Sequence, residues 1–360
     1  MNKKSFVLLR WFLLCVILIS CSENDILPDK DNENTSEPDI EDCITVEIEA
    51  GKTLDDYLTL AQKRTISCLK IVGDLSDPSL EVIREMGDNA NLSILDLSEA
   101  HILEGMNQEE NQIGLRMFEG CKNLIRVILP YEATEIRHSS FDHCRNLESV
   151  VIYNKVRKMS LDAFYYCTKL KELNIPESVQ KIEHSLTRCD SLACINVSEN
   201  NPYYRSIDGV LYSKDVDTLF CYPSGKKDKV YTVPESVKEI NQNACEYNSY
   251  VETVIVLGNI SVGSWAFRYC SDLRTIYFLG ETTLLYSSCF QTDFIKEIYF
   301  ASMKPFIGPD DVLNSISKNL TIYIPLRTYD AYWEALGRSY WAGKSLKEID
   351  MTNILSMAYN

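Results

Sequence analysis

The chain has 360 residues, of which 45% are hydrophobic, 10% aromatic and 24% charged. This composition excludes a wholly disordered chain and a collagen-like or low-complexity fibre. The 36 Lys and Arg against 52 Asp and Glu leave a formal net charge of −16, which argues against nucleic-acid binding because phosphate contacts need clustered basic side chains.

The first twenty residues have the pattern of an export signal. Three basic residues precede a short apolar run over 11–19, and spanning a bilayer takes about 20 apolar residues. The sequence Leu18-Ile19-Ser20-Cys21 resembles the lipobox of bacterial lipoproteins. The resemblance implies cleavage before Cys21 and lipidation of Cys21, whose acyl chains anchor a protein to a membrane. The alternative is an ordinary signal peptide with a chance cysteine.

Residues 21–42 are predicted to form an acidic, disordered tether. Residues 22–42 hold nine Asp and Glu and one Lys, so the segment repels itself and has little apolar surface to bury. Ser22-Glu23-Asn24-Asp25 resembles the acidic tags that send some lipoproteins to the outer face of the outer membrane. The alternating acids at 29–33 are no calcium loop, because Asn34 and Ile40 stand where Gly and Glu are needed.

Residues 43–91 are predicted to form an N-terminal cap. Thr53-x-x-Asp56 has the pattern of a capping box, with apolar residues at helical spacing from Leu54 to Ala61 behind it. Asp77-Pro78 indicates a second helix start. The first leucine-rich strand is expected at Leu92-x-x-Leu95-x-Leu97.

Residues 92–325 repeat at a period of about 23 residues. The period is set by large apolar anchors: Phe118, Phe141, Phe164, Leu186, Phe267 and Phe290. A cysteine stands three residues after five of these anchors: Cys121, Cys144, Cys167, Cys189 and Cys270. A Leu follows three residues later, and then a pair of alternating apolar residues. The alternation predicts one short strand in each repeat, with its apolar side chains pointing inward.

A single repeat cannot fold alone. Ordering its backbone costs about 1–2 kcal/mol per residue, whereas each large buried side chain returns only about 1.5–3 kcal/mol. Neighbouring repeats must therefore stack and bury each other's flanks. The predicted fold is an α/β repeat, a solenoid with a parallel β ladder and short helical N- and C-terminal caps.

The repeat Met117-Phe118-Glu119-Gly120-Cys121 and its continuation to Pro130 resemble the BspA-type leucine-rich repeats of bacterial surface proteins. The resemblance covers roughly residues 66–350. The sequence departs from the family pattern where Leu186, Cys245 and Asn248 replace the expected Phe, Phe and Cys. A hairpin insertion is predicted over about 199–224, because Asp208-Gly209 stands between two apolar runs. The resemblance implies adhesion, with host matrix proteins or other cells as the kind of partner.

Residues 326–350 are predicted to form a C-terminal helical cap. Tyr329, Tyr332, Trp333 and Leu336 follow the spacing of a short amphipathic helix that would cover the last repeat. The tail over 351–360 carries no pattern that assigns it a role.

The cysteines and histidines predict no metal site, cofactor or catalytic residue. Of 13 Cys, the 11 that remain after loss of Cys15 and lipidation of Cys21 are expected to form mostly a reduced, buried column. Equivalent side chains on parallel strands point the same way, which suits disulfides poorly. Zinc needs Cys and His at short spacing, and His138 and His184 are expected in surface turns. With no hydrolase or nucleotide-binding motif present, an enzyme is not expected.

The outward strand positions offer a candidate partner-binding surface. Tyr277, Tyr299 and Tyr323 fall on successive strands with Ile255 before them, and tyrosine suits contact with protein or glycan. The alternatives are stacking that only stabilises the sheet, or burial under the C-terminal helix.

The sequence thus predicts a lipid-anchored outer-membrane protein that displays its solenoid at the cell surface. Its expected function is adhesion or protein–protein recognition, with host matrix or other cells as the partner. A glycan-capture accessory of a nutrient-uptake system is the first alternative, and an undetected hydrolase is the second.

Overall fold

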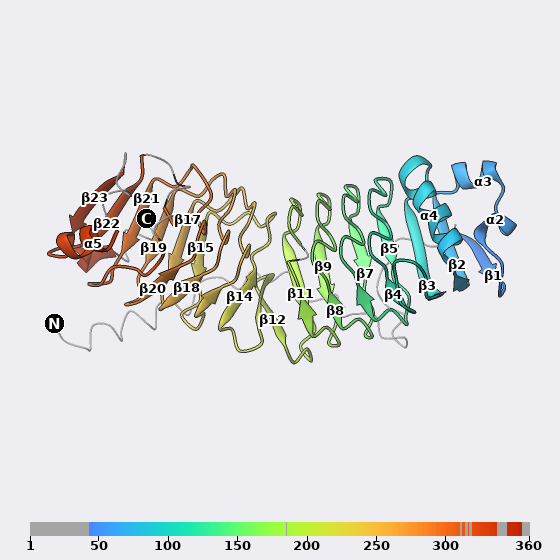
Figure 1. Ribbon diagram of the computed structural model, residues 1–360, viewed down its shortest axis with the longest axis horizontal. Helices are drawn as coiled ribbons and strands as arrows, with labels where there is room; N and C mark the ends of the chain where they lie inside the picture. The colour runs from blue at the N-terminus through green and yellow to red at the C-terminus, as the bar shows by residue number, and fades with distance from the viewer. Residues whose placement is uncertain are drawn as a thin grey trace.

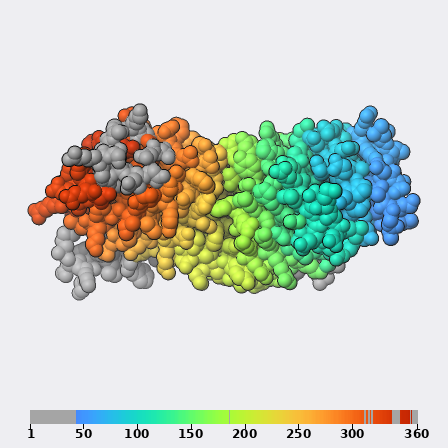
Figure 2. Space-filling model, in the orientation of Figure 1, coloured from blue at the N-terminus to red at the C-terminus, as the bar shows by residue number. Residues whose placement is uncertain are grey.

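The computed structural model describes residues 43–184, 186–309, 312–313, 316, 319–336 and 344–354. The expected signal peptide, the tether with Cys21 and most of the tail lie outside these ranges. The chain winds into an elongated solenoid whose coils follow one another along one axis (Figure 1). Successive segments accordingly form bands across the molecular surface (Figure 2). No helix in the described ranges is long and apolar enough to cross a membrane.

Three parallel strands and three helices begin the solenoid. They are β1 (Ile44–Ile48), α2 (Leu54–Tyr57), α3 (Leu60–Thr65), β2 (Cys68–Leu75), α4 (Asp77–Asn89) and β3 (Ile94–Ile102). The Thr53 amide donates to the Asp56 carboxylate at 2.8 Å, which confirms the predicted capping box. The helical spacing that continued to Ala61 is divided, because Leu58 is extended and Thr59 caps a separate helix. A Cys43–Cys68 disulfide that no sequence pattern indicated joins the start of β1 to β2.

Each regular coil contributes two short strands, one more than the alternation predicted. The predicted strands are β5 (Arg126–Ile128), β7 (Ser149–Val151), β9 (Glu172–Ile175) and β11 (Cys194–Val197), then β15 (Val230–Val233), β17 (Thr253–Val256), β19 (Thr275–Phe278), β21 (Glu297–Phe300) and β22 (Thr321–Pro325). The additional strands are β4 (Gln112–Ile113), β6 (Glu135–Ile136), β8 (Lys158–Met159) and β10 (Lys181–Ile182), then β16 (Glu239–Ile240), β18 (Ile260–Val262) and β20 (Thr283–Leu285). Both sets pair in parallel with equivalent residues opposite each other, as in Val127↔Val150.

The anchor side chains stack along the interior, as the period predicted. Phe118, Phe141 and Phe164 are fully buried, with ring centroids 5.2 and 5.3 Å apart. Phe267 and Phe290 repeat the arrangement at 6.0 Å. The anchors therefore form one stacked column on each side of the insertion, which no single coil could bury alone.

The cysteine column satisfies backbone carbonyls inside the turns. The thiols of Cys144, Cys167 and Cys189 donate to the carbonyl of the anchor one coil earlier, at 3.0 to 3.2 Å. Burial raises the pKa of the Cys144 thiol well above its usual value, so it stays protonated. Asn248, which replaces a cysteine, donates its amide to the Pro223 and Ser224 carbonyls.

An insertion interrupts the solenoid near its middle. Strands β12 (Tyr204–Ile207) and β13 (Val210–Ser213) pair antiparallel, and Asp208 and Gly209 form the turn with positive φ. Strand β14 (Thr218–Cys221) then pairs with both β13 and β16. Neither strand ladder continues directly across the insertion, and the buried apolar residues divide into two main clusters at this point.

The C-terminal end combines a helix with a strand that the sequence did not predict. Helix α5 (Tyr329–Leu336) buries Tyr332, whose hydroxyl donates to the Ser302 carbonyl at 3.0 Å. Strand β23 (Ser345–Ile349) extends the ladder beyond β22. A 3₁₀ turn, Met351–Asn353, follows it.

Candidate recognition surface

The tyrosines predicted to face solvent form a ladder that is largely covered. Rings of Tyr277 and Tyr299 lie 4.5 Å apart, and those of Tyr299 and Tyr323 lie 4.4 Å apart. The expected exposure is wrong for Ile255, Tyr277 and Tyr299, which are at most 6% exposed. The cover is Ile354, with Ile349 and Met351 beside it, and no described residue of the C-terminal helix belongs to this cluster.

Hydrogen bonds also support a structural role for these stacked tyrosines. The hydroxyls of Tyr299 and Tyr323 both donate to the Glu297 carboxylate, at 3.2 and 3.3 Å. Burial raises the pKa of Tyr277 and Tyr323, so these hydroxyls stay protonated. Tyr323 alone of the four candidate residues is half-buried. A binding role for the four stays a prediction.

A second column of large side chains lies at the turns, two residues after each anchor. We call it the aromatic–arginine ladder, and its members are His143, Tyr166, Arg188, Tyr247 and Tyr269. Its side chains are half-buried or exposed, with Tyr269 at 43%. It runs along one edge of the solenoid, at the turns between the two strands of each coil, such as the turn between β6 and β7.

The backbone of every ladder residue is left-handed. The φ angles lie between 55° and 63°, a region that costs a residue with a Cβ about 1–2 kcal/mol. In the first coil the equivalent residue is Gly120, with φ 75°, which avoids this cost. A second turn column has the same left-handed φ at Arg116, Ser139, Asp162, Asn243, Trp265 and Ser288. The size and stacking of the five ladder side chains, and not their backbone alone, therefore set the ladder apart.

The side chains of the ladder stack in register. The rings of His143 and Tyr166 are 4.8 Å apart and nearly parallel. The Arg188 guanidinium lies between Tyr166 and Tyr247, at 4.6 and 4.4 Å from the two ring centroids. Tyr247 and Tyr269 follow at 4.9 Å. Arg188 thus bridges the insertion and joins the two halves of the solenoid at this edge.

Further aromatic and cationic groups widen this surface. Arg268 lies over the rings of Trp265 and Tyr269, at 5.6 and 4.6 Å from the centroids. A groove of about 590 Å³ beside the ladder is lined by Tyr247, Tyr269 and Phe294 among others. The result is an aromatic surface with embedded guanidinium groups.

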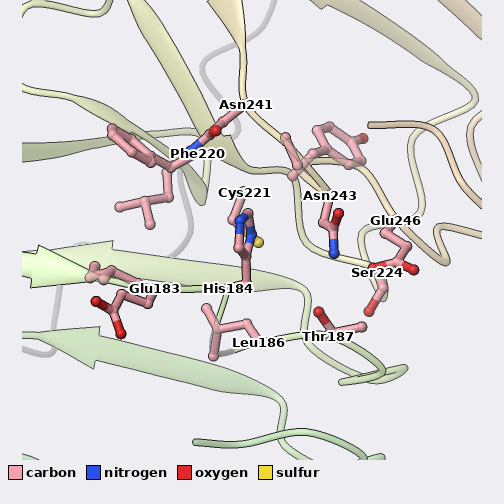
Figure 3. Close-up of a pocket in the computed structure, with 14 residues that line it drawn as sticks. Glu183, His184, Leu186, Thr187, Phe220, Cys221, Ser224, Asn241, Asn243 and Glu246 are labelled. Atoms are coloured by element: carbon pink, nitrogen blue, oxygen red, sulfur yellow. The ribbon is translucent and has the colours of Figure 1, made fainter. Parts of the chain in front are cut away.

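A smaller cavity of about 210 Å³ lies next to the ladder, at the break in the solenoid. Figure 3 shows the side chains around it, which come from 182–184, 186–187, 220–224 and 241–246 and from Leu211 of β13. Burial raises the pKa of Glu246 to about 7 and lowers that of His184.

The four histidines have mainly structural surroundings. His101 contacts the carboxylates of Asp74 and Glu110, which raise its pKa against a smaller effect of burial. His138 contacts the Leu161 carbonyl, and His143 belongs to the ladder. Cys221 lines the same cavity as His184, but burial raises its thiol pKa to about 12, which removes it as a nucleophile. Within the described ranges no three His, Cys, Asp or Glu side chains converge on a metal position.

The aromatic–arginine ladder was not predicted from the sequence, although a periodic pattern indicated it. The residue directly before the cysteine of each coil recurs at the same 22- to 23-residue spacing in the coils anchored by Phe141, Phe164 and Leu186. In these coils it is His, Tyr or Arg. The alternation of strand residues placed the predicted binding surface on the sheet instead, where three of the four candidate residues are covered.

The fold and the turn surface define a leucine-rich-repeat solenoid. A family model described as the BspA type leucine-rich repeat region matches residues 101–207 and 224–320 in six copies. The chain belongs to this family, which confirms the resemblance seen in the repeats. The family is non-enzymatic, and its repeats serve protein–protein recognition.

Several solved structures are similar to this chain at low sequence identity and with TM-scores below 0.5. A leucine-rich cell surface protein from Faecalibacterium prausnitzii is 18% identical, covering 87% of this chain and 85% of that chain with a TM-score of 0.48. The pneumococcal vaccine antigen PcpA is 18% identical, covering 79% and 80% with a TM-score of 0.46. A leucine-rich repeat protein from Eubacterium ventriosum is 18% identical, covering 80% and 92% with a TM-score of 0.46. No curated protein sequence matches this chain.

Proposed function

We propose that this protein is a cell-surface adhesin that binds an extracellular matrix protein or a protein of another cell through the aromatic–arginine ladder. The observation that carries the proposal is the run of five large aromatic and cationic side chains stacked in register at the turns. Tyr, Trp and Arg dominate the residues that contribute most to protein–protein binding. Tyrosine also supplies a large contact area at low cost in side-chain entropy.

The stacked arrangement suits binding because it is ordered before the partner arrives. Each ring or guanidinium is held by its neighbours at 4.4 to 4.9 Å, so little rotamer freedom remains to be lost. Many copies on one cell would add avidity to a modest single contact.

The anchor at Cys21 belongs to the same proposal. Lipid on Cys21 would hold the protein at the outer membrane, and the acidic segment before residue 43 would carry the solenoid away from the bilayer. Protease treatment of intact cells should remove the solenoid. Survival of the full protein on intact cells would contradict surface display.

The ladder itself is tested by Tyr269→Gly. Glycine suits the left-handed backbone, so the strain relieved should roughly balance the lost stacking, and the free energy of unfolding should change by less than about 1 kcal/mol. Binding to immobilised fibronectin, fibrinogen, laminin or collagen, measured by surface plasmon resonance, should fall at least about tenfold, the loss of one anchor contact.

The matched control is Tyr203→Ala. Tyr203 is 48% exposed and lies at the hairpin insertion, away from the ladder. Binding should be unchanged in this variant. Equal losses for both variants, or a partner that binds Tyr269→Gly at full affinity, would contradict the proposal.

A further inference from the structure

The cavity at the break has a definite origin in the sequence. At position 186 the anchor column holds Leu where the other coils before the insertion hold Phe, so less volume is filled. Strand β10 is also the last of its ladder, and the ladder resumes from the hairpin at β14. The missing ring and the missing strand contact leave the space of about 210 Å³ that Leu186 and Phe220 help to line.

Two residues that line this space each carry a buried acceptor atom without a hydrogen-bond partner among the described residues. These atoms are Asn243 Oδ1 and Glu246 Oε2, and the Glu246 side chain is only 3% exposed. An unpaired buried polar atom costs about 1–3 kcal/mol. Two of them beside one cavity indicate that a hydrogen-bonding ligand or water completes the site.

The charge of Glu246 is already balanced inside the protein. Its Oε1 lies 3.3 Å from Arg268 Nη1, so a second cation is not required. Desolvation raises its pKa to about 7, so the group is present both as an acceptor and as a hydroxyl donor near neutral pH. A neutral ligand with several hydroxyls fits such a site better than an organic cation.

The surroundings also favour a ligand with a ring. Ser224 lines both the cavity and the neighbouring groove, and the aromatic rings of Tyr247 and Tyr250 lie along that groove. Arg188, which also lines the groove, has a buried Nε that makes no hydrogen bond among the described residues and lies 3.9 Å from Asp190 Oδ1. Unpaired donors, unpaired acceptors and aromatic faces together match the alternating hydroxyls and apolar ring faces of a sugar.

We propose that the cavity at the solenoid break binds one ring of a neutral saccharide, with Asn243 and Glu246 contacting its hydroxyls. The volume corresponds to about seven water molecules, enough for one sugar ring. The lining of the cavity itself includes none of the five ladder residues, whereas Arg188, Tyr247 and Tyr269 line the neighbouring groove.

Saturation-transfer NMR tests the site with methyl glycosides of glucose, mannose, galactose and N-acetylglucosamine. At least one should receive saturation from the wild-type protein. Leu186→Phe restores the anchor ring, fills the cavity and should abolish that signal without lowering the melting temperature. Glu246→Ala should weaken binding at least about tenfold, because it removes a buried polar contact. Leu60→Phe, at an exposed residue of the N-terminal cap, is the matched control and should bind like wild type.

The outcomes separate a sugar site from a water-filled packing defect. Absence of transfer to all four glycosides, with Leu186→Phe simply more stable, would overturn the proposal. Transfer that persists in both Leu186→Phe and Glu246→Ala would place the sugar elsewhere and overturn it too. If Leu186→Phe does not fold, Glu246→Ala and Asn243→Ala decide: sugar binding should weaken in both, and unchanged binding in both would overturn the proposal. His143→Gly changes a ladder residue that lines neither the cavity nor the groove and should leave sugar binding intact, so failure of the ladder proposal and failure of this one are distinguishable.

Discussion

Arg188 shows how one side chain connects the two halves of the molecule. Its guanidinium lies between the rings of Tyr166 and Tyr247, and its Nη2 donates to the Tyr166 hydroxyl at 2.8 Å. Tyr166 belongs to a coil before the insertion and Tyr247 to a coil after it, so the contact replaces strand pairing that is missing there.

We expect Arg188→Met to lower the free energy of unfolding by about 1–3 kcal/mol, because two partly buried cation–π contacts are lost. Arg188→Lys keeps the charge without the planar stack and should fall between Met and wild type. Urea unfolding followed by circular dichroism measures both. A Met variant as stable as wild type would show that the stack contributes nothing to stability.

Single residues also mark the limit of what the sequence predicted. The stacked Phe anchors and the buried cysteines follow from spacing alone, because a fixed period forces equivalent residues into columns. The burial of Tyr277 and Tyr299 could not be predicted, because alternation shows which face of the sheet a side chain lies on but not what covers that face. The cover is Ile354, in a tail that carries no repeat.

The individual coils are more regular than the alternating pattern suggested. Strands such as Glu135–Ile136 hold only one inward apolar residue, too few to stand out in a sequence. The hairpin, in contrast, was evident from Asp208-Gly209 because few other pairs suit that turn. The disulfide of the N-terminal cap lies outside the repeat pattern, so the period gave no indication of it.

Removing that disulfide should destabilise the first strands selectively. Cys43 and Cys68 are 25 residues apart, and a loop of that length contributes about 3 kcal/mol in chain-entropy terms. We expect Cys43→Ser to speed proteolysis within 43–75 while the later coils stay protected. Reductant should have the same effect on wild type and none on the variant, and a variant as resistant as wild type would contradict the pairing.

The whole molecule is one solenoid with two hydrophobic interiors. The main buried clusters divide at the insertion, so stacking should couple coils strongly within each half and weakly between halves. Apart from Trp11 in the expected signal peptide, the tryptophans (265, 333 and 341) all follow the insertion. Fluorescence of the chain without the signal peptide is therefore a probe of the second half alone.

We expect Phe141→Ala to cost about 3–5 kcal/mol and to shift only the part of the circular-dichroism transition that belongs to the first half. Tryptophan fluorescence should then change at the wild-type urea concentration. Phe267→Ala should shift the fluorescence transition instead. Probes that move together in both variants would show a single cooperative unit.

Hydrogen exchange with and without the bound partner protein tests the central claim most directly. The account predicts new protection at the turns that carry His143, Tyr166, Arg188, Tyr247 and Tyr269, with little change on the strands β7, β9 and β11. Protection confined to those strands, or to the hairpin insertion, with the turns unaffected, would contradict recognition by the aromatic–arginine ladder.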